Sequence, residues 1–282
     1  MINLQEFKSM LKSPPQNGSE MIDRAWELAV TAYNEKEYGH GTGVPYKYHL
    51  AEVALKLLKN GYDAHVVTAG ILHDILEDRK DTGVTIEDLE EMGFSEEAIN
   101  GVRYATYDLD MDTEEAKDAG DWPTYVVMRA SKKIRKIFKK DIDPETKRRH
   151  KVNRAKSTPI SWIVKYYDSL CNFESVDKVP DRRSGRPEHN RKKYLRSLLE
   201  LAQGVLESDD IPSQKTIDEY YKKLHKDDKK KCIGAFALGK LGLDQRNELI
   251  LRFTEESNSA LAQQNPLPDF APEPHNGIMA GL

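Results

Sequence analysis

The segment from Ile71 to Asp78 holds four ionisable side chains among apolar residues: His73, Asp74, Glu77 and Asp78. Carboxylates are costly to bury in such a segment unless they are paired or bind a metal ion. An imidazole and an adjacent carboxylate can both reach one divalent cation. The segment therefore predicts part of a metal site that needs further ligands from elsewhere in the chain.

Two other stretches could supply those ligands. His49 stands at the start of a helix-like segment that ends at Lys59. Farther along, Asp168 lies in the apolar-periodic stretch I-V-K-Y-Y-D-S-L-C-N, with Asn172 about one helical turn later. Mixed imidazole and carboxylate ligands suit manganese, iron or zinc.

Apolar periodicity predicts the helices that position these residues. A helix over 64–77 would place Asp74, Glu77 and Asp78 on one face, because residues three and four apart are neighbours. His65 is predicted to be an exposed polar residue of this helix. Further helices are predicted over 21–33, with Ser19 as N-cap, and over 52–58, 84–92, 160–173, 190–206, 217–224, 231–241 and 245–257.

The order of these motifs resembles a known family. The pattern H…HD…ED…D-x-x-x-N is similar to the HD superfamily of metal-dependent phosphohydrolases. A more specific resemblance is to the hydrolase domain of RelA/SpoT homologues and their small single-domain relatives. It rests on three motifs in order: P-Y-x-x-H, A-G-I-L-H-D-x-x-E-D and V-K-x-x-D-x-L-x-N. The match covers roughly the first two-thirds of the chain, and its specificity comes from several blocks in the right order.

The resemblance implies an all-α HD-domain helical bundle with one divalent metal ion, manganese first and iron or zinc as alternatives. The implied metal ligands are His49, His73, Asp74 and Asp168. Glu77 and Asp78 would orient or deprotonate the attacking water and move a proton toward the leaving oxygen. Side chains implied to contact the nucleotide are Tyr46, Lys165, Asn172, Arg191 and Tyr194.

Two of these roles have structural alternatives. Glu77 and Asp78 could cap the helix end or pair with Lys80, but the helix dipole disfavours carboxylates near a helix C-terminus. For Tyr194, packing in the core is the default role of a tyrosine on an amphipathic helix.

The implied reaction is removal of the 3′-pyrophosphate from guanosine tetra- or pentaphosphate by a hydrolase without a synthetase domain. One alternative is an HD phosphohydrolase that acts on dNTPs or another signalling nucleotide. The other is a nucleotide-binding regulator that has lost catalysis, which the intact metal set and E-D pair disfavour.

The loop from Tyr38 to Val44 is rich in glycine. Its G-H-G-T-G sequence could be a phosphate cradle, but such a loop should follow a strand and open a helix in a βαβ unit, and neither strand of that unit is visible in the sequence. A flexible entry to the site is the favoured interpretation. The family pattern has a basic residue here, whereas this loop contains no arginine, so Lys36 or His40 would have to substitute.

Composition bounds the remaining alternatives. The chain of 282 residues has a net charge of −4 and two isolated cysteines, Cys171 and Cys232. The absence of about 18 consecutive apolar residues disfavours a membrane span, and the isolated cysteines suit a reducing, cytoplasmic compartment. The net charge disfavours general affinity for nucleic acid.

Charge patterns and the reach of the family motifs predict the domain organisation. We expect an HD domain over residues 1–207, with a charged insertion at about 108–157, a helical extension over 208–263, and a disordered tail over 264–282. The insertion is first acidic and then basic. Its basic part could attract a polyanionic substrate or be a solvated face. The basic region or the extension could also bind a protein partner or a second copy of the chain.

Overall fold

The computed structural model describes residues 14–106, 144–179, 187–203 and 211–263. Over these residues the chain forms twelve α-helices and no strand, which confirms the predicted all-α class. The helices are α2 (Gly18–Ala32), α3 (Lys47–Lys59), α4 (Ala64–Leu72), α5 (Arg79–Thr82), α6 (Ile86–Glu91), α7 (Glu96–Ala105), α11 (Pro144–Ala155), α12 (Pro159–Ser175), α13 (Pro187–Gln203), α14 (Gln214–Leu224), α15 (Lys229–Gly239) and α16 (Leu243–Ala262).

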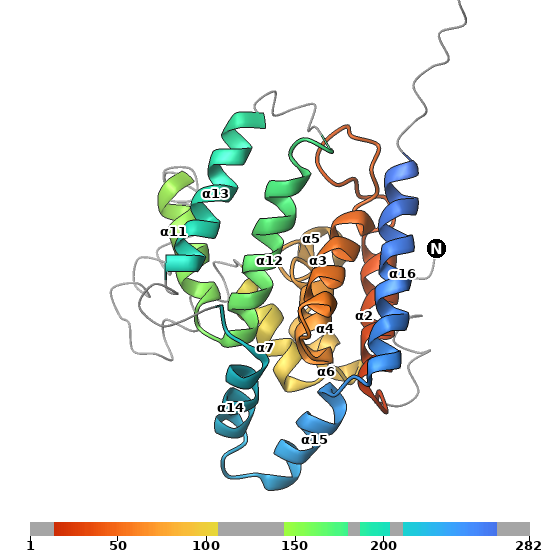
Figure 1. Cartoon of the computed structure of the whole chain (residues 1–282), viewed down its shortest axis with the longest axis vertical. Coiled ribbons are helices and arrows are strands. Elements are labelled where there is room, and N and C mark those ends of the chain that lie inside the picture. Colours follow the sequence, from red (N-terminus) through yellow and green to blue (C-terminus); the bar gives the residue numbers. More distant parts are fainter. Residues whose placement is uncertain (1–13, 107–143, 180–186, 204–210, 264–282) are drawn as a thin grey trace, which may run out of the picture.

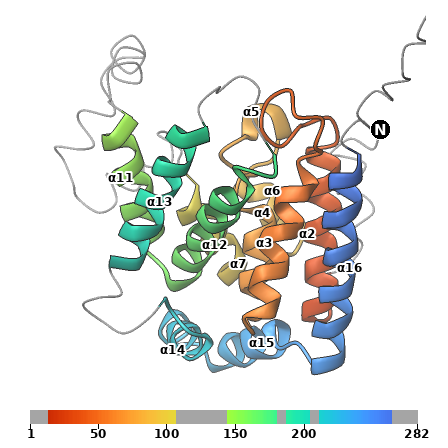
Figure 2. The same ribbon diagram turned by 45° about the horizontal axis from the view of Figure 1, so that its top comes forward.

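Helix α4 is the centre of the bundle. All nine of its residues are buried, which suits a sequence whose only polar side chains are His65 and Thr68. Helices α2, α3, α7 and α12 pack around it (Figures 1 and 2). The H-D motif directly follows α4, so this arrangement delivers it into the middle of the molecule.

Close approach of α4, α7 and α12 depends on Gly101. A Cβ atom at this position would lie 2.5 Å from Ile160 Cγ2 and 2.8 Å from Ala69 Cβ. Both neighbours are parts of buried side chains, which leaves little room for relaxation.

Gly101→Ala is therefore expected to lower the free energy of unfolding by about 1–3 kcal/mol, the usual effect of an overpacked core. Gly234→Ala is the matched control, because Gly234 lies in the middle of α15 with no heavy atom within 4 Å of the added Cβ. That variant should gain about 0.5–1 kcal/mol from helix propensity. Urea unfolding of both variants tests the assignment, and an unchanged midpoint for Gly101→Ala would contradict it.

The predicted helix over 64–77 ends earlier than expected. Helix α4 ends at Leu72, and residues 73–78 form successive turns before α5. The Gly70 carbonyl, which would accept the Asp74 N–H in a continuing helix, accepts the His73 imidazole at 2.8 Å instead. The prediction of one continuous helical face for the carboxylates was therefore wrong.

Two local predictions were also wrong. The N-cap of α2 is Asn17 rather than Ser19, since the Asn17 side chain accepts the Glu20 N–H at 3.0 Å. His65 is fully buried rather than exposed, with its ring nitrogens 2.7 Å from Ser95 Oγ and 2.7 Å from the Ala235 carbonyl. The burial of His65 could not be predicted from the sequence around it, because α15, which carries Ala235, covers it from a distant part of the chain.

The helices after residue 210 pack on the same core as the earlier ones. Helix α16 runs beside α3 (Figures 1 and 2). The Phe253 ring of α16 meets the Trp26 ring edge-on, with centroids 5.0 Å apart. Ile217 and Tyr221 of α14 belong to that core too. The predicted boundary at 207/208 stays a prediction. Residues 107–143, which hold most of the predicted insertion, and the predicted tail lie outside the described residues.

Candidate metal centre and cavity

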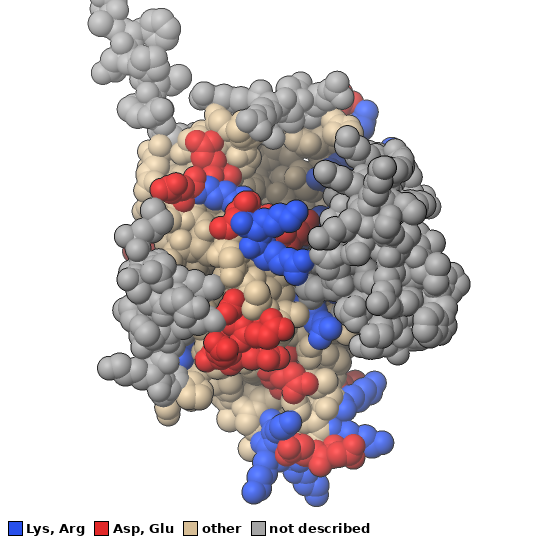
Figure 3. Space-filling model, turned by 180° about the vertical axis from the view of Figure 1, so that it is seen from behind, with Lys and Arg blue, Asp and Glu red and all other residues tan. Residues whose placement is uncertain are grey.

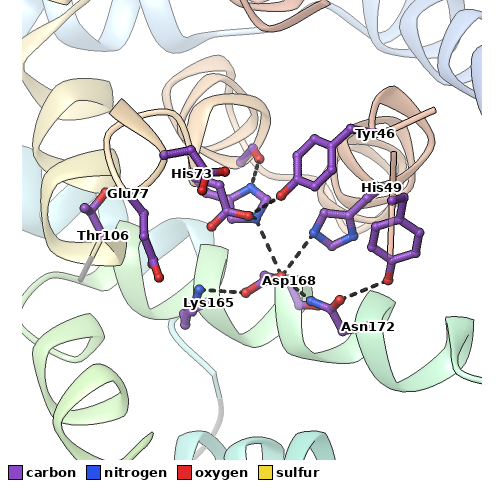
Figure 4. A network of polar contacts seen from close by, with 12 residues as sticks. Tyr46, His49, His73, Glu77, Thr106, Lys165, Asp168 and Asn172 are labelled. Atoms are coloured by element: carbon purple, nitrogen blue, oxygen red, sulfur yellow. Dashed lines mark hydrogen bonds and ion pairs between the residues drawn. The ribbon is translucent and has the colours of Figure 1, made fainter. Parts of the chain in front are cut away.

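Three helices bring the predicted metal ligands together. His49 comes from the first turns of α3, His73 directly follows α4, and Asp168 comes from the middle of α12 (Figure 4). One ligand atom from each residue lies within 4.8 Å of the others, and all three residues are buried. Two imidazoles and a carboxylate form a donor set that a divalent transition-metal ion would fit.

Asp168 is the hub of this group. Its Oδ1 lies 3.1 Å from His49 Nε2 and accepts a hydrogen bond from Asn172 Nδ2, while its Oδ2 lies 2.8 Å from Lys165 Nζ (Figure 4). Thr158 caps α12 and Pro159 begins it, which fixes the start of the helix that carries these side chains. The structure thus places Lys165 and Asn172 next to Asp168.

A backbone carbonyl holds the imidazole of His73. Its Nδ1–H donates to the Gly70 carbonyl, so Nε2 carries the lone pair when the ring is neutral. Nε2 is buried, lies 3.1 Å from Asp74 Oδ2 and 3.5 Å from Asp168 Oδ1, and has no hydrogen-bond partner in the described structure. A backbone carbonyl on the other ring nitrogen is a typical second contact of a metal-binding histidine.

The fourth predicted ligand, Asp74, lies beside this group. It is not one of the three side chains that converge within 4.8 Å among the described residues. Its Oδ2 is close to His73 and accepts a hydrogen bond from the Tyr46 hydroxyl. Tyr46 therefore contacts a predicted ligand directly, in addition to lining the cavity described below.

Charges at the site stabilise one another. Burial lowers the pKa of His73, but the Asp74 and Asp168 carboxylates outweigh burial and raise the pKa to about 10. Burial opposes ionisation of Asp168, yet Lys165 and His73 hold the pKa of its carboxyl well below the ordinary value. The same attraction raises the pKa of Lys165 against the effect of its burial.

The metal-free protein should therefore lose stability as pH rises. The folded-state pKa of His73 exceeds its unfolded value, so its contribution is fully present below about pH 6.5 and disappears as pH passes through about 10. Thermal unfolding in EDTA between pH 6 and 10 measures this, with His73→Asn as control. The wild-type Tm should fall more steeply than that of the variant, and parallel curves would contradict the prediction.

The two predicted catalytic carboxylates occupy different surroundings. Glu77 forms an ion pair with Lys151 of α11 and lines the cavity. Asp78 forms an ion pair with Lys36, and the Tyr33 hydroxyl donates to it at 3.4 Å. Burial is the largest cause that raises the pKa of the Asp78 carboxyl, and the Asp74 and Glu77 carboxylates add to it. Together they outweigh the contact with Lys36, which lowers this pKa.

A cavity of about 500 Å³ lies against the metal group. Among the residues that the structure describes, four cationic ones line it: Arg148 and Lys151 from α11, Lys165 from α12, and Lys193 from α13. The pKa of Lys193 is lowered by desolvation and by the neighbouring Lys151 cation. Such a crowded set of positive charges suits an anionic ligand with more than one phosphate group.

Four of the five residues predicted to contact the nucleotide line the cavity, and the fifth lies outside it. Tyr46, Lys165, Asn172 and Tyr194 line the cavity. Arg191 is instead exposed and forms an ion pair with the exposed Asp177. Cavity residues that sequence reasoning did not single out for contact with the nucleotide are Tyr38, Gly39, Arg148, Lys151, Val152, Ser169, Lys193 and Ser197.

A buried His–His–Asp group in a helical bundle, opening onto a cationic cavity, defines a protein suited to metal-assisted chemistry on phosphates. Residues 25–105 match the family model described as HD domain, so this part of the chain is similar to that family. The matched range includes His49, His73 and Asp74, whereas Asp168 follows it in the sequence.

Particular relatives are similar over short segments. The guanosine-3′,5′-bis(diphosphate) 3′-pyrophosphohydrolase of Aquifex aeolicus (strain VF5) is 38% identical over 87 residues, which are 31% of this chain. The probable GTP diphosphokinase RSH2, chloroplastic, of Oryza sativa subsp. japonica is 44% identical over 57 residues, or 18% of this chain. The chain spans only 12% and 8% of the length of these two relatives.

One solved structure also resembles the chain, that of a metazoan ortholog of SpoT described as hydrolysing ppGpp. It has a TM-score of 0.47 and 18% sequence identity, over 72% of this chain and 95% of that chain.

Proposed function

We propose that the protein is a metal-dependent nucleotide phosphohydrolase that removes the 3′-pyrophosphate of guanosine tetra- or pentaphosphate. The observation that carries the proposal is the direct opening of the buried His49–His73–Asp168 group onto a cavity lined by four cationic residues. Similarity to the Aquifex pyrophosphohydrolase over 87 residues supports the choice of substrate.

His49, His73 and Asp168 would hold the metal ion, with Asp74 as a fourth ligand after release from His73. We propose manganese, with iron or zinc as alternatives. The bound ion would supply Lewis-acid polarisation of a phosphate oxygen and make water more acidic. Lys165 keeps Asp168 ionised and oriented through their 2.8 Å contact.

Glu77 is proposed to take a proton from the attacking water, because it is a carboxylate on the cavity wall near the metal group. Water attacks the phosphorus atom bonded to the 3′ oxygen, and the bond between this phosphorus and the 3′ oxygen breaks. A proton delivered to that oxygen then completes release of pyrophosphate and the nucleoside 5′-di- or triphosphate. Asp78 would assist from its position next to Lys36.

Other cationic side chains that line the cavity would bind the second phosphate chain. Lys151 and Lys193 supply ammonium groups, and Arg148 supplies a guanidinium. The Tyr194 ring, which lies 4.9 Å below Lys193 Nζ, would pack against the base or sugar.

A second candidate function is hydrolysis of dNTPs or another signalling nucleotide. The observation that favours it is the composition of the glycine-rich loop, which contributes Tyr38 and Gly39 to the cavity wall and no cationic side chain. Lys36 is turned instead toward Asp78, and His40 is exposed.

A manganese-supplemented hydrolysis panel separates these candidates. Guanosine tetraphosphate, guanosine pentaphosphate and each dNTP would be incubated with the protein, and the products identified by ion-exchange chromatography. We expect pyrophosphate with GDP or GTP from the guanosine substrates. Turnover of dNTPs alone would favour the second candidate, and no turnover despite bound metal would favour a nucleotide-binding regulator.

Location and partners are part of the same proposal. No helix in the described ranges combines the length and apolar character needed to cross a bilayer. We propose a cytoplasmic enzyme without nucleic acid as substrate. A homo-oligomer or a protein partner would use the basic region or the C-terminal extension, where lysines gather around the turn between α14 and α15 (Figure 3). These exposed lysines are Lys222, Lys223, Lys226, Lys229, Lys230 and Lys231.

A further inference from the structure

The glycine-rich loop between α2 and α3 is closed by its own hydrogen bonds. Tyr38 N–H donates to the Val44 carbonyl at 2.7 Å, and Tyr46 N–H donates to the Lys36 carbonyl at 2.8 Å. Inside the loop, the Thr42 hydroxyl donates to the Tyr38 carbonyl at 2.7 Å. Gly43 has a φ of +72°, a conformation that glycine adopts without strain. The loop therefore fixes the backbone of Tyr38.

The Tyr38 side chain makes two contacts with the metal group. Its ring stacks on the His49 ring, with centroids 4.8 Å apart and planes 5° apart. Its hydroxyl donates to Asn172 Oδ1 at 2.9 Å. Since Asn172 Nδ2 donates in turn to Asp168, one tyrosine contacts both an imidazole ligand and the amide that holds the carboxylate ligand.

The two histidines of the site are held differently. His73 has its Nδ1 bonded to the Gly70 carbonyl, the kind of contact that usually fixes a metal-binding imidazole. His49 Nδ1 is buried and has no hydrogen-bond partner in the described structure. The His49 ring is therefore oriented by the contact of its Nε2 with Asp168 Oδ1 and by packing. Among the rings that pack on it, Tyr38 is the one that lies parallel to its face, whereas Tyr46 and His73 meet it edge-on.

We propose that Tyr38 is a positioning residue of the metal centre, and that the glycine-rich loop holds it there. The Tyr38 ring restrains the His49 ring, whose Nδ1 has no hydrogen-bond partner in the described structure. Its hydroxyl restrains Asn172, which in turn orients Asp168. This inference rests on the metal site of the proposed function and is independent of the substrate. It gives the loop a role other than the phosphate cradle or flexible entry considered from sequence.

Mn²⁺ affinity of purified full-length variants, measured by isothermal titration calorimetry, tests the proposal without any substrate. Tyr38→Phe keeps the ring stack and removes the hydroxyl, and should weaken Mn²⁺ binding by roughly tenfold, the lower end for contacts that orient metal ligands. Tyr38→Leu removes both contacts and should weaken binding by about a hundredfold. Circular dichroism establishes that each variant is folded.

A matched pair of glycine variants tests the loop. Gly43 and Gly61 have φ values of +72° and +83°, and an added Cβ at either would have no atom within 4 Å. Gly43→Ala and Gly61→Ala should therefore lower Tm by similar amounts through backbone strain. Only Gly43→Ala, in the loop that carries Tyr38, should also weaken Mn²⁺ binding.

The outcomes separate this inference from the proposed function. Wild-type Mn²⁺ binding with equal affinity in Tyr38→Phe, Tyr38→Leu and Gly43→Ala would overturn the role of Tyr38 and leave the metal site standing. Failure of the wild-type protein to bind Mn²⁺, Fe²⁺ or Zn²⁺ would overturn both. Weakened binding in the Tyr38 variants, together with a wild-type protein inactive on every nucleotide, would support Tyr38 and overturn only the proposed reaction.

Discussion

Asp168→Asn should abolish tight metal binding and lower turnover by at least about a thousandfold. The variant keeps the size of the side chain but removes the charge that faces His49, His73 and Lys165. A bound metal ion supplies several kcal/mol of charge stabilisation to a phosphoryl oxygen, and about 4 kcal/mol corresponds to that factor. Metal content after dialysis and the rate of pyrophosphate release measure the two effects.

The same variant should be less stable than wild type even without metal. Lys165 is largely buried, with 13% of its side chain exposed, and would lose its ion-pair partner. Breaking a buried pair from one side costs about 3–5 kcal/mol. Asp177→Asn is the matched control, since Asp177 is exposed and pairs with exposed Arg191. Equal metal binding and stability in the two variants would contradict the central role of Asp168.

Glu77→Gln should lower turnover by roughly 10²–10⁴-fold while leaving the affinity for Mn²⁺ within about twofold of wild type. General acid–base catalysis by one positioned side chain contributes about that much. Glu77 lines the cavity and is not among the three side chains that converge in the described metal group. Single-turnover hydrolysis and calorimetric titration of Mn²⁺ measure the two quantities.

Asp78→Asn is the control for this prediction. Asp78 pairs with Lys36 and does not belong to the residues that line the cavity in the described structure, so its loss should slow turnover less than that of Glu77. A larger loss of turnover in Asp78→Asn than in Glu77→Gln would contradict the assignment of the main proton transfer to Glu77.

That His49, His73 and Asp168 lie together could be predicted from sequence, because these residues lie in short motifs on or next to helices. His49, His73 and Asp168 each belong to a motif whose order resembles a known family. Helices α4 and α12 begin within one residue of the predicted positions, whereas α3 begins at Lys47, five residues before the helix predicted over 52–58. The end of α4 could not be predicted in this way. Ile75 and Leu76 continue the apolar pattern and are buried, yet they lie in turns rather than in a helix.

Long-range packing explains what the sequence did not show. The basic run before α12 was visible, but nothing local distinguished Arg148 and Lys151, which line the cavity, from its other cations. Lys193 enters the cavity wall only because α13 packs beside α12. Tyr38 lies in a loop whose glycines suggested a flexible segment. The hydrogen bonds that close this loop are formed by backbone groups, so the types of its residues do not reveal them.

Manganese titration of EDTA-treated protein, followed by the rate of pyrophosphate release from guanosine tetraphosphate, tests the central claim most directly. If His49, His73 and Asp168 form the metal centre of a phosphohydrolase, activity should be absent without metal and should saturate at one Mn²⁺ per chain. Asp168→Asn should remain inactive throughout the titration. Metal-independent release of pyrophosphate, or full activity in Asp168→Asn, would contradict the claim.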